Sequence, residues 1–157
     1  MVIGSSANRG NMALTTSLPS IARLYMWALG LGLLGEGLML RVMGAFRVEA
    51  PPLPLPIPLS TADPLHDFIH IVWGMVIVAL LIGAPDARVA RLALVFGVFY
   101  VAFGFLGLFV DRPFGLLLGP EQNSFHFTVG PLALVLGWLA TRALGRRRAA
   151  AVAPGGT

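Results

Sequence analysis

Four long apolar runs limit what this chain can fold into more than any other feature. They cover residues 21–43, 64–84, 89–110 and 124–144. Each run has about the 20 residues that a helix needs to cross the hydrocarbon core of a bilayer. Inside a bilayer the backbone has to satisfy its own hydrogen bonds, and an α-helix does so within one segment. The sequence therefore predicts an all-α fold, an antiparallel four-helix transmembrane bundle.

The composition agrees with lipid as the main solvent and excludes several classes of function. The chain is 57% hydrophobic and 11% charged, whereas soluble domains have about 25% charged residues. It has no cysteine, which excludes disulfides, iron–sulfur clusters and zinc–thiolate sites. Its eleven basic residues are all arginine and lie at the ends of apolar runs, not among aromatic residues. This distribution argues against a nucleic-acid partner.

Polar or proline-rich segments separate the four spans. Residues 1–20 are rich in Ser, Thr, Asn and Gly and are expected to form a flexible cytoplasmic leader, with Pro19 and Ser20 marking the start of the first span. Alternate prolines in residues 51–58 favour an extended polyproline rod, because proline cannot donate a backbone hydrogen bond. Residues 145–157 are expected to form a disordered basic cytoplasmic tail.

The distribution of arginines predicts the orientation in the membrane. With the N-terminus inside, eight arginines fall in cytoplasmic segments and three in outer ones. Positive charge in short loops favours the cytoplasmic side. We therefore expect a multi-pass protein of the bacterial inner (cytoplasmic) membrane, with both termini in the cytoplasm and the three histidines near the outer face.

Small residues recur at helical spacing in two of the predicted spans. In membranes, such stripes allow the backbones of two helices to approach closely. The stripes are Ala28, Gly32 and Gly35 in the first span, and Gly97, Gly104 and Gly107 in the third.

Polar residues gather where the second span begins. Asp63 is suited to cap the helix, and Pro64 to occupy its first position. At 100° per residue, His66, Asp67 and His70 share one stripe with Asp63 that is about 100° wide. Such a stripe is costly in lipid, so it should face the bundle interior or water.

A carboxylate from the first span is expected at the depth of these histidines. His70 lies about 9 Å below the start of its helix, and Glu36 about 10 Å below the outer end of the first span, at 1.5 Å per residue. A contact between Glu36 and His70 is therefore geometrically allowed. His126 enters the same region from the fourth span.

The polar residues admit three interpretations. The first is structural, with hydrogen bonds that hold the helices together. The second is a metal or haem site that uses His66, His70 and His126, with Asp67 and Glu36 as further metal ligands, because His-x-x-x-His places two imidazoles on one helix face. The third is a proton-linked or pH-sensing group, because histidine titrates near neutral pH and a glutamate within a span is a functional candidate.

Several short motifs resemble those of a small bacterial four-helix membrane family, catalogued as domain of unknown function 4383. The matching segments are Leu65–Gly74, Gly97–Tyr100, Gly107–Asp111 and Asn123–His126. The family pattern joins L-H-x-x-x-H-x-x-x-G in the second span to a Tyr in the third and to N-x-x-H at the start of the fourth. The resemblance implies a four-helix membrane fold and no particular activity.

The function predicted from the sequence is that of a membrane protein without catalytic machinery. No nucleophile triad, Walker loop or H-E-x-x-H motif is present, so we do not expect an enzyme. The leading hypothesis is an accessory or scaffold subunit of a membrane complex, whose partners are the lipid bilayer and other membrane-protein subunits or further copies of itself. The alternatives are a metal- or haem-binding protein and a small proton-coupled permease or pH sensor.

Overall fold

A computed structural model describes residues 6–46 and 63–152, with side chains from residue 17 onwards. These residues form four α-helices and one short 3-10 helix, and no strand occurs among them. This confirms the predicted all-α class. The proline-rich segment 51–58 lies outside the described residues. The elements are α1 (Ser6–Phe46), α2 (Pro64–Leu81), α3 (Asp86–Gly107), η1 (Pro113–Gly115) and α4 (Pro120–Val152).

All four α-helices are long and apolar enough to cross a membrane, so the chain is a multi-pass membrane protein. Large apolar side chains cover the outside of the helices, where a soluble protein would place polar ones. Lipid accounts for this exposure, because it solvates apolar groups at no cost. Examples in the helices are Leu24, Phe46, Val95 and Val98, each at least 60% exposed.

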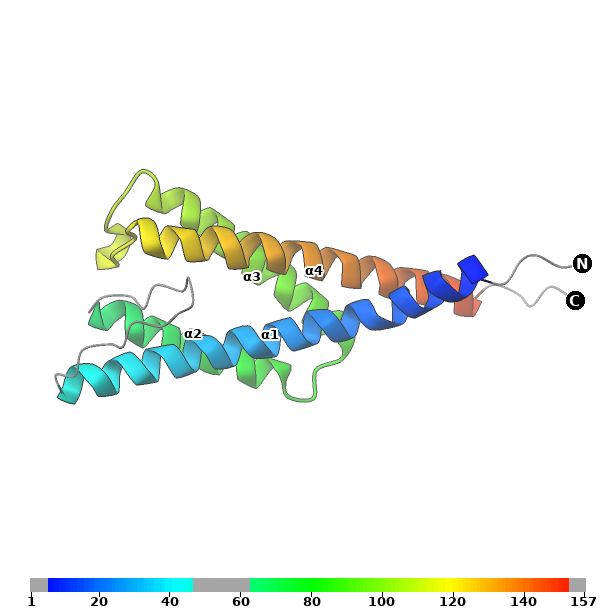
Figure 1. Ribbon diagram of the computed structural model, residues 1–157, viewed down its shortest axis with the longest axis horizontal. Helices are drawn as coiled ribbons and strands as arrows, with labels where there is room; N and C mark the ends of the chain where they lie inside the picture. Colours follow the sequence, from blue (N-terminus) through cyan, green and yellow to red (C-terminus); the bar gives the residue numbers. More distant parts are fainter. Residues whose placement is uncertain (1–5, 47–62, 153–157) are drawn as a thin grey trace, which may run out of the picture.

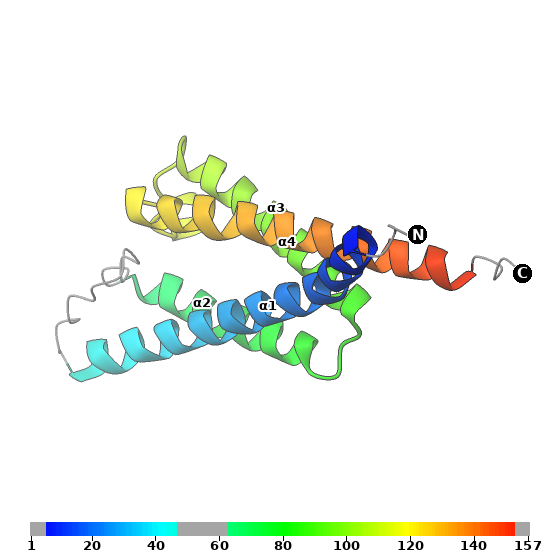
Figure 2. The ribbon, with the colours of Figure 1, turned by 45° about the vertical axis from the view of Figure 1, so that its right-hand side comes forward.

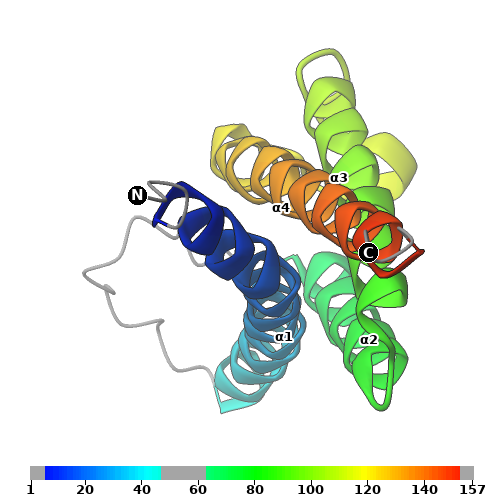
Figure 3. The same cartoon turned by 90° about the vertical axis from the view of Figure 1, so that its right-hand side faces the viewer.

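The helices pack as two pairs. α1 packs mainly on α2, and α3 on α4, while α1 also contacts α4 and α3. In Figure 1, the colour gradient runs in opposite directions in successive helices, so α1 and α3 end where α2 and α4 begin. We call the end of the bundle that contains His66, His70 and His126 the histidine end. We call the opposite end, where α3 begins and α4 ends, the arginine end. The two pairs diverge towards the histidine end (Figures 1 and 2), and Figure 3 shows how the helices cross when viewed along the long axis.

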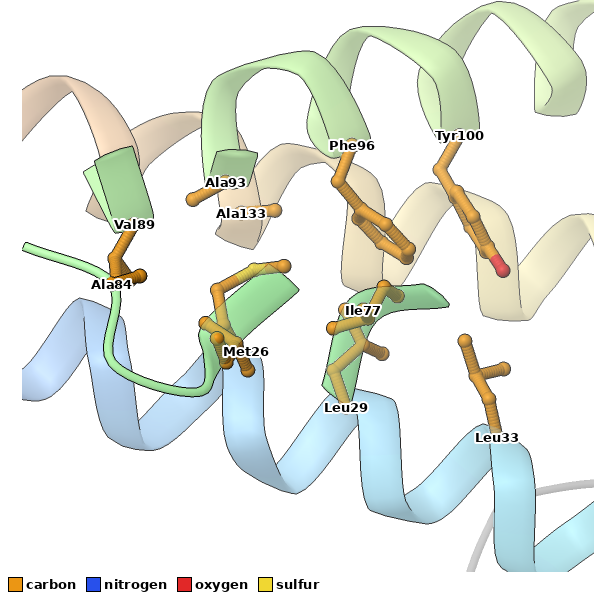
Figure 4. Packing of buried hydrophobic residues seen from close by; sticks show 11 residues of the cluster. Met26, Leu29, Leu33, Ile77, Ala84, Val89, Ala93, Phe96, Tyr100 and Ala133 are labelled. Carbon is orange, nitrogen blue, oxygen red and sulfur yellow. The ribbon is translucent and has the colours of Figure 1, made fainter. Parts of the chain in front are cut away.

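An apolar core joins the two pairs near the middle of the helices. Figure 4 shows its side chains meeting from both pairs, with Phe96 and Tyr100 of α3 above Leu29 and Leu33 of α1. The rings of Phe96 and Tyr100 stack with centroids 4.0 Å apart. The residues of this core are Met26, Leu29, Leu33, Ile77, Leu81, Ala84, Val89, Ala93, Phe96, Tyr100 and Ala133.

Glycines allow the close approach of helices within each pair. A Cβ atom on Gly74 would lie 2.6 Å from the backbone nitrogen of Leu34, and one on Gly97 would lie 2.7 Å from that of Leu134. Neither residue can be larger without moving a helix. The other predicted contact glycines of α3 also face α4, Gly104 against the side chains of His126 and Phe127 and Gly107 against that of Asn123, and a larger residue at either position would displace these side chains.

The small-residue stripe predicted in the first span does not mediate helix contact. A Cβ atom on Gly32 or Gly35 would meet nothing within 4 Å, and Ala28 is exposed. The contact residues of α1 are Gly30, which faces Ile77, and Gly37, which faces the backbone of α2. Periodicity identified small residues on one face, but a different face of α1 meets its partner.

An ion pair joins α1 to the start of α3 at the arginine end. One guanidinium nitrogen of Arg23 on α1 lies 2.7 Å from a carboxylate oxygen of Asp86 and donates a hydrogen bond of 2.6 Å to the carbonyl of Ala84. Ala84 belongs to the turn between α2 and α3, in which Gly83 adopts a φ of 64°, and Asp86 is the first residue of α3. The contact therefore fixes this turn against α1.

Two terminal predictions need correction. Helix α1 begins at Ser6, inside the predicted flexible leader 1–20, and Pro19 lies within the helix. Helix α4 continues to Val152, inside the predicted disordered tail 145–157. Extending an existing helix is far easier than nucleating one, and Ala and Arg are good helix formers. At 1.5 Å per residue α1 and α4 measure about 60 and about 50 Å, longer than the roughly 30 Å core of a bilayer.

We expect the substitution Gly74→Ala to destabilise the protein by about 1–3 kcal/mol, because the new methyl group would overlap the α1 backbone at Leu34. Gly32→Ala is the matched control, since its methyl group meets no neighbour, and it should leave stability unchanged or slightly raised. Thermal unfolding of the two variants in detergent measures the difference. Equal loss of stability in both variants would contradict this account of the α1–α2 contact.

Candidate functional site

Asp63 organises the backbone at the histidine end. It precedes α2, which starts with Pro64, and one carboxylate oxygen accepts hydrogen bonds from the backbone N–H groups of Leu65 and His66, at 3.1 and 3.4 Å. This confirms the predicted helix cap. The other oxygen accepts a hydrogen bond of 2.9 Å from the N–H of Leu117, in the segment between α3 and α4. One carboxylate therefore ties the two helix pairs together where they diverge.

The same hydrogen bonds set the acidity of Asp63. Partial burial acts to raise the pKa of this carboxyl group, but the three backbone donors outweigh burial and the net effect is a lowered pKa. Because the donors stabilise the charged form, the cap is ionised throughout the neutral range.

A glutamate and a histidine meet inside the α1–α2 pair, a contact that the similar depth of the two residues allows. One carboxylate oxygen of Glu36 lies 3.3 Å from Nδ1 of His70. Both side chains are largely buried, with 16% and 8% of their surface exposed. His66 lies one helical turn before His70, and the two imidazole rings are 4.5 Å apart in an edge-to-face arrangement. Ionisable groups at this depth in a membrane helix are costly and are therefore functional candidates.

A small cavity lies between the two helix pairs at this point. Its volume is about 20 Å³, and it is lined by Glu36, His66, His70, Glu121, Gln122, Phe125 and His126. A space of this size can hold one water molecule. His126 reaches the cavity from α4 and packs edge-on against Tyr100, with ring centroids 5.2 Å apart. All three histidines thus line one cavity whose walls belong to different helix pairs.

Two imidazole nitrogens of the site lack a protein partner. The Nδ1 atoms of His66 and His126 are buried, and neither atom donates or accepts a hydrogen bond. A buried polar atom without a partner costs about 1–3 kcal/mol.

The structure separates one predicted site residue from the others and adds three that the sequence did not indicate. Asp67 is buried at the contact between α1 and α2, where its backbone carbonyl faces Gly37, and it does not line the cavity. Gln122, Phe125 and Glu121 line the cavity in its place. Gln122 could have been found from the sequence, because it precedes His126 by one turn on the same face of α4.

The geometry limits the cofactors that this site can hold. A porphyrin needs a pocket of several hundred Å³, so haem does not fit a cavity of about 20 Å³. Within residues 6–46 and 63–152, no three His, Asp or Glu side chains are arranged to hold a metal ion together. The metal hypothesis for His66, His70, His126, Asp67 and Glu36 stays a prediction, which requires a side chain to reorient.

No family model, curated protein or solved structure matches this chain. The resemblance to the domain of unknown function 4383 family therefore stays a prediction.

We expect Asp63→Ala to destabilise the protein by about 0.5–2 kcal/mol, the usual cost of losing a helix cap, and to expose the N–H of Leu117 to hydrogen exchange. The lowered pKa also fixes the pH dependence. The stabilisation by Asp63 is fully present above the unfolded carboxyl pKa of 3.8 and is lost as the pH falls through the lower folded value. Unfolding measured against pH, together with exchange at Leu117, checks both effects. Unchanged exchange at Leu117 in the variant would count against the cross-link.

Proposed function

We propose that this multi-pass membrane protein is pH-responsive and that the Glu36–His70 pair and the neighbouring histidines bind and release protons. The observation that carries the proposal is the 3.3 Å contact between Glu36 and His70 inside a membrane helix pair, beside a cavity with room for one water molecule. Histidine changes charge near neutral pH, and a carboxylate at hydrogen-bond distance can share or exchange its proton. A water molecule in the cavity would carry the proton to or from the pair.

The position of the site suggests what proton binding changes. His66 and His70 stand on one wall of the cavity and His126 on the other. Protonation on both walls would place like charges in a small, water-poor space, where they repel strongly. The walls belong to the two helix pairs, which already diverge at this end (Figure 1). Acidification should therefore separate the pairs at the histidine end.

Other ionisable groups lie near the pair and shape this response. Glu36 is the nearest carboxylate to His70, and Glu121 adds a second one to the cavity. These acids offset part of the added positive charge, so the response depends on several groups together. The ionisable residues around the site are Glu36 and Arg41 from α1, Asp63, His66, Asp67 and His70 at α2, Tyr100 from α3, and Glu121 and His126 from α4.

We further propose that the arginine end faces the cytoplasm of a bacterial cell, so that both termini are cytoplasmic. Exposed arginines gather there, on α3 at Arg88 and Arg91 and on α4 at Arg146 and Arg148, as the bias of membrane proteins requires. In this orientation the proton site faces the outside of the cell. Reporter tags on the two termini test the topology, and tags that report opposite compartments would refute it.

Metal binding is a second candidate, supported by the unpartnered Nδ1 atoms of His66 and His126. Imidazole nitrogens suit zinc, copper and nickel ions. Elemental analysis and an absorbance scan of protein purified in mild detergent test this candidate. A stoichiometric metal that the double variant His66→Ala/His70→Ala loses would support it. A metal content that survives in the double variant would remove it.

We expect the distance between the helix pairs at the histidine end to increase as the pH falls from about 8 to about 4, because the histidines on the two walls of the cavity gain charge in acid. The chain contains no cysteine, so Phe46→Cys and Phe109→Cys place two spin labels cleanly. Both positions are exposed, and Phe46 ends α1 whereas Phe109 follows the end of α3, so they report on different helix pairs at this end. Double electron–electron resonance in nanodiscs should show a longer mean distance at low pH.

Two controls make the measurement specific. The double variant His66→Gln/His126→Gln should lose the response, and Glu36→Gln should change the pH at which it occurs. Labels at Leu24 and Arg146, which are exposed on α1 and α4 towards the arginine end, should report no change. A distance that is independent of pH at the histidine end, or equal changes at both ends, would refute the proposal.

A further inference from the structure

A second, much larger cavity opens at the histidine end, on the opposite side of the first turns of α4. It has a volume of about 500 Å³ and lies between the end of α3, residues 118–120 and the start of α4. Asn123 and Phe127 face this cavity, whereas Gln122 and His126 face the small one. The two cavities are therefore separate, and the larger one has no part in the proposed proton binding.

The polar side chains that line this cavity are Asp111, Asn123 and Ser124. Asp111 contributes an exposed carboxylate. Asn123 is only 7% exposed, and its Oδ1 is buried against Gly107 and accepts no hydrogen bond. The hydroxyl of Ser124 donates to the carbonyl of Pro120 at 2.8 Å, so its oxygen is left as an acceptor. Arg112 follows Asp111 in the chain but does not line the cavity.

Two helix ends line this cavity and their dipoles oppose each other. Helix α3 ends at Gly107, and Gly107 and Leu108 form part of the wall, where the negative end of the α3 dipole lies. The facing wall contains Pro120 and Asn123 in the first turn of α4, where the positive end of the α4 dipole lies. The carboxylate of Asp111 is therefore the group that favours a positively charged ligand.

The size of the cavity and its apolar walls favour an organic cation over a metal ion. Metal ions such as calcium take six to eight oxygen ligands at about 2.3–2.6 Å, and Asp111 is the only carboxylate in the lining. The remaining wall includes Leu108, Leu118 and Phe127. A volume of about 500 Å³ lies in the range of small-molecule sites, which are mostly apolar with a few polar groups. An aromatic ring at such a site also attracts ammonium groups.

We propose that this cavity binds a small organic ammonium group, with Asp111 as its charged contact and Phe127 as an aromatic part of its wall. The flanking side chains Phe109 and Phe114 are 84% and 86% exposed. Aromatic residues at the end of a membrane helix belong at the level of the lipid headgroups. The ammonium group can therefore come from a lipid headgroup or from a free solute, and both sources share the same chemistry.

The test measures choline binding to the full-length chain in maltoside detergent, which has no ammonium group. Saturation-transfer NMR should detect choline but not its neutral isostere 3,3-dimethyl-1-butanol. Asp111→Asn should weaken choline binding about tenfold, because it removes the negative charge that attracts the quaternary ammonium group. Asn123→Asp, which adds a second carboxylate to the lining, should strengthen it.

Glu121→Gln is the matched control. It removes one negative charge from the same end of the protein, but Glu121 lines only the smaller cavity. Choline affinity should stay within about twofold of the original protein in this variant. Equal signals from choline and the neutral isostere, or unchanged affinity in both Asp111→Asn and Asn123→Asp, would overturn the proposal. Because Asn123→Asp is expected to gain affinity, loss of folding cannot imitate the expected result.

Bilayers of defined composition identify the source of the ammonium group. In phosphatidylcholine nanodiscs, lipid that occupies the cavity would suppress the signal from free choline. In phosphatidylglycerol nanodiscs, which offer no ammonium group, free choline should bind. Suppression by phosphatidylcholine supports the site with a lipid ligand, and equal binding in both bilayers supports it with a soluble ligand. Failure to bind choline in either bilayer and in detergent would refute the site.

Discussion

Hydrocarbon offers no hydrogen bonds, and this constraint governs most of the structure. It explains why the described residues between the turns are helical, since a helix satisfies its own backbone. It also explains why the polar side chains of α2 turn inwards, where they find Glu36, the loop backbone and α4 as partners. Because lipid removes the usual hydrophobic drive between helices, contact depends on small residues such as Gly74 and Gly97, which bring two backbones together.

The sequence was informative wherever a local rule decides the outcome. Span length and hydropathy predicted the four helices, and cap chemistry predicted the role of Asp63. The rise per residue showed that a contact between Glu36 and His70 was allowed, and the structure contains it. Helix ends were less predictable, because extension of α1 and α4 beyond their apolar runs depends on small propensities. The ends at Ser6 and Val152 therefore differ from the expected ones.

Contacts between helices were the part that a single sequence could not determine. Periodicity shows which residues share a face, but it does not show which face meets a neighbour. For this reason the stripe with Gly32 and Gly35 was mistaken for a contact surface, whereas Gly30 and Gly37 make the contact. For the same reason the sequence grouped Asp67 with the histidines, although it does not line the cavity, and did not indicate Gln122, which does. Both corrections depend on the rotation of each helix about its axis, which only the packed structure specifies.

The start of α4 connects the two cavities mechanically. Gln122 and His126 form part of the wall of the small cavity, and Asn123 and Phe127 part of the wall of the large one. All four residues belong to two successive turns of one helix, which moves as a rigid unit over this length. Any rotation or tilt of α4 that widens one cavity must therefore alter the other. A proton taken up beside His126 and a cation held beside Asn123 would then influence each other through α4, and by linkage the influence would be equal in both directions.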